Sequence, residues 1–128
     1  PDHFFEETRR VLKRHGIVAI STPNLACWFN RVIFLFGYQP FFLEASTQDK
    51  TVGIAFTRKL TPNRQPLGHM RVFTLKALND LISLHGFEVL EARGGRVGYL
   101  PKFLNIFDRL FSYIPSLATD LIVIAKKK

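Results

Sequence analysis

The sequence contains a single cysteine, and this scarcity removes two classes of site. With only Cys27 present, an internal disulfide and any metal site built from several cysteines are excluded. Cys27 stands in an apolar run, where a buried thiol is the expected state. The four histidines are dispersed along the chain (His3, His15, His69 and His85), so no metal site is predicted.

The chain also lacks a long uninterrupted apolar run. The longest, residues 25–36, is interrupted by Asn30 and Arg31 and is followed by Gly37 and Pro40. Its length as a helix is about 18 Å, well short of the roughly 30 Å hydrocarbon core of a bilayer. No membrane-spanning helix is therefore expected. The first residues are acidic and amphipathic rather than basic and then apolar, which argues against a secretory signal.

Acidic residues are scarce relative to basic ones. The ten Asp and Glu face 18 Lys and Arg, which gives a formal net charge of +8. Such a balance favours anionic partners such as nucleic acid or a membrane surface. The basic residues are scattered, apart from residues 126–128, so a solvated surface is favoured and no nucleic-acid partner is expected. A basic nucleic-acid-binding α/β domain remains an alternative, to be tested by the salt dependence of binding.

Apolar residues are plentiful by contrast. They make up 47% of 128 residues, which is enough for one packed core. The 13 phenylalanines are many for this length. They indicate either a Phe-rich core or an apolar surface that meets something outside this chain.

Helical and extended patterns alternate along the chain, which predicts an α/β fold. The expected helices cover residues 3–14 (with Asp2 as N-cap and Gly16 as the stop), 25–36, 74–85 (with Thr74 as N-cap) and a segment that begins at Pro101. The expected strands cover residues 17–21, 87–92 and 121–125. Three strands are few for a sheet flanked by four helices, so the chain looks like part of a larger sheet.

Two of these predictions concern details of the sheet. Residues 17–21 show no alternation, which predicts a strand buried on both faces, as in a parallel sheet. Gly94, Gly95 and Gly98 follow a strand, but their spacing differs from that of a dinucleotide-binding loop and predicts a turn.

Residues 37–71 carry no periodicity and are punctuated by proline and glycine. They predict a long loop or insertion, with a short strand near residues 52–56. A loop of this length in a compact domain is usually functional or mobile, so a lid is expected here.

Residues 4–24 (FFEETRRVLKRHGIVAISTPN) resemble a stretch of the class I S-adenosylmethionine-dependent methyltransferases. In that family a helix, an R-x-L-K-x-G-G-like turn and the fifth strand follow one another. The matching residues are Arg10, Val11, Leu12, Lys13 and Gly16, while His15 stands where a first glycine is usual. The ending Ser21-Thr22-Pro23-Asn24 looks like the S-x-P-N that follows this strand in many members.

Two later segments extend the resemblance in the family's own order. Residues 68–92 (GHMRVFTLKALNDLISLHGFEVLEA) resemble the H-x-R-x-F-T entry to a helix, followed by G-F-x-V and the sixth strand. Residues 117–128 (LATDLIVIAKKK) look like the seventh strand, which in this fold runs antiparallel to its neighbours. The resemblance implies that residues 1–128 form the C-terminal portion of a Rossmann-like methyltransferase sheet, with strands 5, 6 and 7 and their flanking helices.

The family's glycine-rich turn and acidic ribose-binding residue have no counterpart here and would precede Pro1. The resemblance therefore implies an S-adenosylmethionine site outside this chain, in a missing N-terminal half of the domain. The activity implied is methyl transfer to a small-molecule, lipid-linked or sugar-linked acceptor. This chain would supply the substrate side and be inactive alone, in a cytoplasmic protein.

The candidate site residues lie in two segments. His69 and Arg71 border the substrate pocket by resemblance, where His69 could accept a proton and Arg71 could hold an anion. The alternative is that both only pin the following helix. Thr22 and Asn24 follow the carboxyl end of a strand, where α/β sheets bind ligands, although Asn24 could equally cap the next helix.

Aromatic residues between Trp28 and Phe42 supply the last candidates, of which Trp28 and Tyr38 are placed at the substrate site. They could form a lid over an apolar acceptor or an interfacial membrane anchor. Core packing against the missing half is the alternative. A competing function follows from the same residues, namely a non-catalytic methyltransferase-like module that contacts a protein or, peripherally, a membrane.

Overall fold

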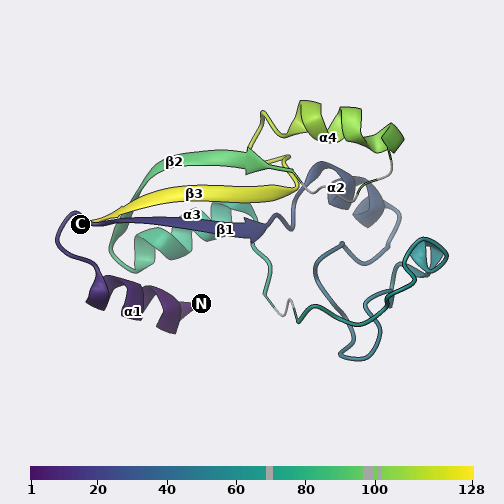
Figure 1. Cartoon of the computed structure of the whole chain (residues 1–128), viewed down its shortest axis with the longest axis horizontal. Helices are drawn as coiled ribbons and strands as arrows, with labels where there is room; N and C mark the ends of the chain where they lie inside the picture. The colour runs from purple at the N-terminus through teal and green to yellow at the C-terminus, as the bar shows by residue number, and fades with distance from the viewer. Residues whose placement is uncertain (69–70, 97–99, 101) are drawn as a thin grey trace.

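The computed structural model describes residues 1–68, 71–96, 100 and 102–128. Within them, the chain forms one three-stranded sheet and four α-helices (Figure 1). The strands are β1 (Ile17–Pro23), β2 (Phe87–Gly95) and β3 (Asp120–Lys127). The helices are α1 (Asp2–Val11), α2 (Trp28–Leu35), α3 (Leu75–Leu84) and α4 (Asn105–Phe111), with short 3-10 turns η1 (Ala55–Thr57) and η2 (Lys102–Leu104). In these described ranges, every helix falls short of the length and apolar character needed to cross a bilayer.

The sheet has the order β1-β3-β2, so the last strand of the chain lies in its centre. β3 runs antiparallel to both neighbours, with Ala125 opposite Val18 on one side and opposite Val89 on the other. β1 and β2 therefore run parallel to each other on the two sides of β3. The predicted α/β class and the predicted antiparallel last strand are confirmed.

The prediction that β1 is buried on both faces is wrong. Its residues alternate, with Ile17 60% exposed while Val18 and Ile20 pack against the core. Among the described residues β1 pairs only with β3, and that pairing is antiparallel. α1 and α3 contribute to the same core, while Ile17 and Ile122, which face away from it, are 60% and 37% exposed.

That core joins both helices to all three strands. Its fully or nearly buried members are Phe5, Leu78, Ile82, Phe87, Leu121, Val123 and Ala125. Burial of apolar side chains from elements far apart in sequence is the main stabilising contribution to such a sheet.

Polar contacts hold the two ends of α1. Asp2 was expected to cap the helix but lies in its first turn, where its carboxylate is 3.1 Å from Nε2 of His85. This hydrogen bond lowers the pKa of Asp2. At the other end, Nζ of Lys127 donates to the carbonyl of Leu12 over 2.7 Å. A cation at this position also suits the helix dipole.

α3 begins as predicted, because the Oγ1 of Thr74 accepts a hydrogen bond from the backbone N–H of Ala77 over 3.2 Å. Gly86 follows the helix with φ of +79°, a conformation that glycine adopts without strain.

The turn predicted at Gly94 and Gly95 is wrong, because β2 continues through both residues. A Cβ atom at position 94 would lie 2.2 Å from the carbonyl oxygen of Ser112 and 2.5 Å from Cβ of Ala118. Glycine is therefore needed for close approach between the strand and the segment before β3. Gly98 lies outside the described residues.

Two further predictions differ from the structure. The strand expected near residues 52–56 is absent from that described segment, which instead forms η1 and buries Thr57, whose Oγ1 donates to the carbonyl of Ile54. Pro101, the expected start of the last helix, lies outside the described residues. From Lys102 the backbone forms η2 and then α4.

Candidate functional site

The carboxyl end of β1 is a junction of three segments. The backbone N–H of Asn24 donates to the carbonyl of Thr119, and that of Leu25 donates to the carbonyl of Phe73, each over 2.9 Å. Asn24 and Phe73 also form an isolated parallel bridge. The segment before α3 therefore runs beside the end of β1.

The Asn24 side chain is fully buried at this junction. Its Nδ2 donates to the carbonyls of Ala118 (2.8 Å) and Ser116 (3.2 Å), and its Oδ1 accepts from the N–H of Ala26 (3.0 Å). Both ends of the amide are thus used to hold the turn after β1 against the segment before β3. These contacts give Asn24 a structural role, and its contact with a substrate stays a prediction.

The other predicted residues of this region are distributed around the junction. Thr22 is half-buried in β1, opposite Leu121 of β3. Arg71 is exposed, two residues before the bridge at Phe73. The structure thus brings the Arg71 segment to the end of β1, while His69 lies outside the described residues.

Trp28 lies at the start of α2 and joins this helix to α4. Its ring stacks on Phe111 with 5.6 Å between centroids and tilts against Phe107 at 6.2 Å. Tyr38, by contrast, follows the other end of α2 and packs edge-on against Phe56 at 5.0 Å. The two predicted aromatic site residues therefore have separate partners.

The long loop is anchored to α2 by Asn30, which is buried. Its Oδ1 accepts from the backbone N–H of Phe41 over 2.7 Å, and its Nδ2 donates to the carbonyl of the same residue over 3.1 Å. Phe41 also packs edge-on against Phe29, with 5.4 Å between centroids. The first part of the expected lid is thus fixed to the helix.

Further along the loop, two acidic side chains accept hydrogen bonds from other residues of the same loop. The Glu44 carboxylate accepts hydrogen bonds from the N–H groups of Leu67 and Gly68 over 2.6 and 2.8 Å. Asp49 accepts from the hydroxyl and the N–H of Thr51, and these bonds lower its pKa. A depression of about 390 Å³ lies between residues 44–47 and 65–68.

Asp108 is a buried carboxylate that sequence reasoning missed. Its Oδ1 accepts from Oγ1 of Thr119 and from Nε1 of Trp28, the latter over 3.4 Å. Its Oδ2 lies 3.6 Å from Nε of Arg96. One acid thereby ties α4 to α2, to the residue that precedes β3 and to the residue that follows β2. The only signal in the sequence is an isolated acidic residue within an apolar segment.

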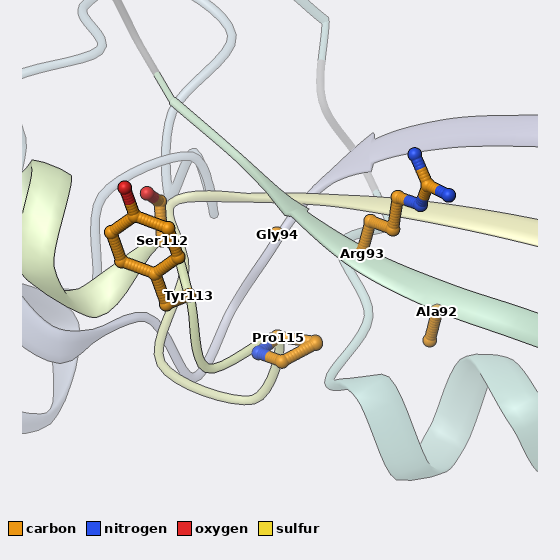
Figure 2. A pocket seen from close by; sticks show the side chains of 6 residues that line it. All are labelled: Ala92, Arg93, Gly94, Ser112, Tyr113 and Pro115. Carbon is orange, nitrogen blue, oxygen red and sulfur yellow. The ribbon is translucent and has the colours of Figure 1, made fainter.

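A second depression, of about 270 Å³, lies between the end of β2 and the segment after α4 (Figure 2). It is lined by Ala92, Arg93, Gly94, Ser112, Tyr113 and Pro115. In Figure 2 the Arg93 side chain does not point toward the Tyr113 ring. The Arg93 guanidinium instead donates to the Glu91 carboxylate over 2.6 Å, which raises the pKa of Arg93. This arrangement leaves Arg93 paired on the surface rather than directed at a ligand.

Cys27 is fully buried at the N-cap of α2, and burial raises the pKa of its thiol to about 12. The thiolate is the reactive form, so we expect Cys27 in the folded protein to resist alkylation at pH 8. The check is labelling with iodoacetamide, followed by mass spectrometry, with and without urea. We expect labelling at least about 100-fold faster in urea; equal rates in both conditions would show that the thiol is accessible.

Within the part of the chain that the structure describes, no group of three or more His, Cys, Asp and Glu side chains could hold a metal ion. The end of β1 thus combines backbone junctions and aromatic packing with exposed cations, among them Arg71, and Arg31, which donates to the carbonyls of Ala26 and Ser116. No protein family matches this chain, and no curated protein matches it either.

Proposed function

We propose that this chain is the C-terminal part of a class I S-adenosylmethionine-dependent methyltransferase domain. The observation that carries the proposal is the sheet order β1-β3-β2, with β3 antiparallel to both neighbours. The resemblance assigns β1, β2 and β3 to strands 5, 6 and 7 of that fold, in which the seventh strand is antiparallel to its neighbours. The topology and the sequence motifs therefore agree.

A second observation supports the same proposal. The S-T-P-N motif ends at Asn24, and the R-x-F-T motif, almost 50 residues later, includes Phe73. These two residues form a parallel bridge, and the N–H of Leu25 donates to the carbonyl of Phe73. Motifs that belong to one substrate-side edge in the family are in contact here.

The proposed reaction moves a methyl group to a small-molecule, lipid-linked or sugar-linked acceptor. S-adenosylmethionine supplies that methyl group, and its main site belongs to the N-terminal half of the domain, outside this chain. The residues of this chain would position the acceptor, with Arg71 exposed beside the junction to hold an anionic group. Catalysis then rests on proximity and orientation, with His69 as the candidate proton acceptor.

The test is calorimetric titration of S-adenosylhomocysteine into the longest natural product that contains these residues. The 128-residue chain is the control. We expect binding to the longer product and none to the control. If neither binds, the methyltransferase proposal is wrong.

A second function is favoured by one specific observation. Large apolar side chains are exposed on α2 and around α4, among them Leu35 at 84% and Phe103 at 72%. Exposed apolar surface of this kind marks an interaction site. A non-catalytic binding module is therefore the competing proposal, and it predicts no cofactor binding to any product.

A further inference from the structure

Positive charge is concentrated at one end of the molecule. Residues 24–73 and 96–119 contain nine Lys and Arg but only three Asp and Glu, so they carry +6 of the net +8. These residues include α2, the long loop and α4, which lie together at one end, away from α1 and α3 (Figure 1). We call this part of the molecule the cationic end.

The three acidic residues of the cationic end are all engaged. Glu44 accepts hydrogen bonds from two backbone N–H groups, and Asp49 accepts two from Thr51. Asp108 is fully buried. The cations, in contrast, are largely exposed, among them Lys102 and Arg109 beside and on α4. The surface potential of this end is therefore positive.

The same end exposes large apolar side chains. Six of them, on or next to α2 and α4, are 62–84% exposed: Phe34, Leu35, Phe36, Phe103, Ile106 and Leu110. The two helices are joined through the stacking of Trp28 on Phe111, so their apolar residues belong to one connected part of the structure.

We propose that the cationic end docks onto an anionic lipid bilayer. Exposed aromatic and aliphatic side chains among cations are the features by which interfacial helices bind: the apolar groups enter the interface and the cations attract anionic headgroups. A second copy of the chain is disfavoured as the occupant, because it would bring +6 against +6. An apolar protein surface would leave Lys102 and Arg109 desolvated without an ionic partner, because the three acidic residues of this end are already engaged.

This inference goes beyond methyl transfer and does not depend on it. The test is co-sedimentation of the purified protein with phosphatidylcholine vesicles and with equimolar phosphatidylcholine–phosphatidylglycerol vesicles. We expect binding to the anionic vesicles only, weakened at about 1 M salt, where the Debye length falls to about 3 Å. The double charge reversal Lys102→Glu, Arg109→Glu should lower the partition coefficient about 30-fold or more, since each cation near an anionic surface contributes about 1 kcal/mol.

Matched variants at the opposite end separate docking from net charge and from general hydrophobicity. Lys13→Glu with Lys76→Glu makes the same change in net charge away from the cationic end, where both lysines are exposed. Leu84→Ser removes an apolar side chain that is 76% exposed on α3, for comparison with Leu110→Ser on α4, which is 62% exposed. We expect the changes at Lys102 and Arg109 and at Leu110, called the α4 variants although Lys102 lies in η2, to reduce binding by at least five times more than their controls.

Three results would overturn the proposal. The first is equal binding to both vesicle types, and the second is an equal loss of binding in the α4 variants and in their controls. The third is a dimer in sedimentation velocity that Leu110→Ser dissociates, with no binding of either monomer or dimer to vesicles. Circular dichroism of each variant confirms that it is folded. Cofactor titration and vesicle binding are separate measurements, so the failure of one proposal leaves the other standing.

Discussion

Replacing Phe87 by alanine is expected to lower the free energy of unfolding by about 3–5 kcal/mol. Phe87 is fully buried at the start of β2 and packs edge-on against Phe5 of α1, with 6.1 Å between ring centroids. Its loss leaves a cavity in the core where α1, α3 and the sheet meet. Urea unfolding followed by circular dichroism measures the change, provided that the slope with denaturant stays the same.

Phe103→Ala is the matched control, because it removes the same atoms from a side chain that is 72% exposed. We expect it to change the free energy of unfolding by no more than about 0.5 kcal/mol. Similar losses in both variants would show that the core described around Phe87 is not the one that stabilises the chain.

The sequence predicted those elements whose signals are local. Thr74 was recognised as a helix cap because a capping side chain contacts a residue three positions away. The strand at residues 17–21 is indicated by an apolar run after a helix stop, that at 87–92 by alternation of apolar and acidic residues, and that at 121–125 by an apolar run. These features depend on neighbours in sequence, and the structure confirms them.

Other features depend on contacts between distant segments and could not be predicted. Ile17, Val18, Ala19 and Ile20 are all apolar, so their pattern cannot distinguish a strand buried on both faces from one with an open face. Gly94 in a run of glycines predicts a turn. The structure shows that glycine is needed there because a Cβ atom would collide with Ser112 and Ala118. Both partners are distant from Gly94 in the sequence, so the residues around Gly94 do not indicate the close approach.

The candidate site likewise contains one part that the sequence predicts from local signals and one part that depends on distant contacts. The end of β1 was predicted from the strand and the S-T-P-N motif alone. Asp108, however, is bound by Trp28, which is 80 residues away in sequence, and by Thr119, which is 11 residues away. An isolated acidic residue in an apolar helix gives no indication of such partners before the fold is known.

The methyltransferase proposal and the membrane-docking proposal assign roles to neighbouring parts of the structure. Acceptor positioning uses the junction at the end of β1, while bilayer docking uses the exposed side chains of α2 and α4. Trp28 connects them, since it begins the helix that leaves the junction and stacks on Phe111 of α4. If both proposals hold, the acceptor would be presented at the membrane surface, which favours a lipid-linked acceptor over a freely diffusing one.

Asn24→Asp is expected to lower the free energy of unfolding at pH 7 by about 3–5 kcal/mol, although it changes the shape of the side chain very little. The wild-type Nδ2 donates to the carbonyls of Ala118 and Ser116 in a fully buried position. A carboxylate oxygen at this point has no proton to donate and would face two carbonyl oxygens. Both carbonyls would lose the hydrogen bond from position 24, and that of Ser116 would keep only the one from Nη2 of Arg31. The introduced charge would be buried against these oxygens with no donor of its own.

The pH dependence distinguishes this mechanism from a simple loss of packing. Burial beside carbonyl oxygens raises the pKa of the introduced carboxyl above its unfolded value of about 3.9. The stability of this variant is then greatest below the unfolded pKa and falls as the pH rises through the folded pKa. Measured by urea unfolding, its deficit relative to wild type should shrink between pH 7 and about pH 4.5, whereas Asn24→Ala, which adds no titrating group, should show a constant deficit. A deficit of Asn24→Asp that does not change with pH would mean that the amide of Asn24 does not make the buried hydrogen bonds that hold the end of β1.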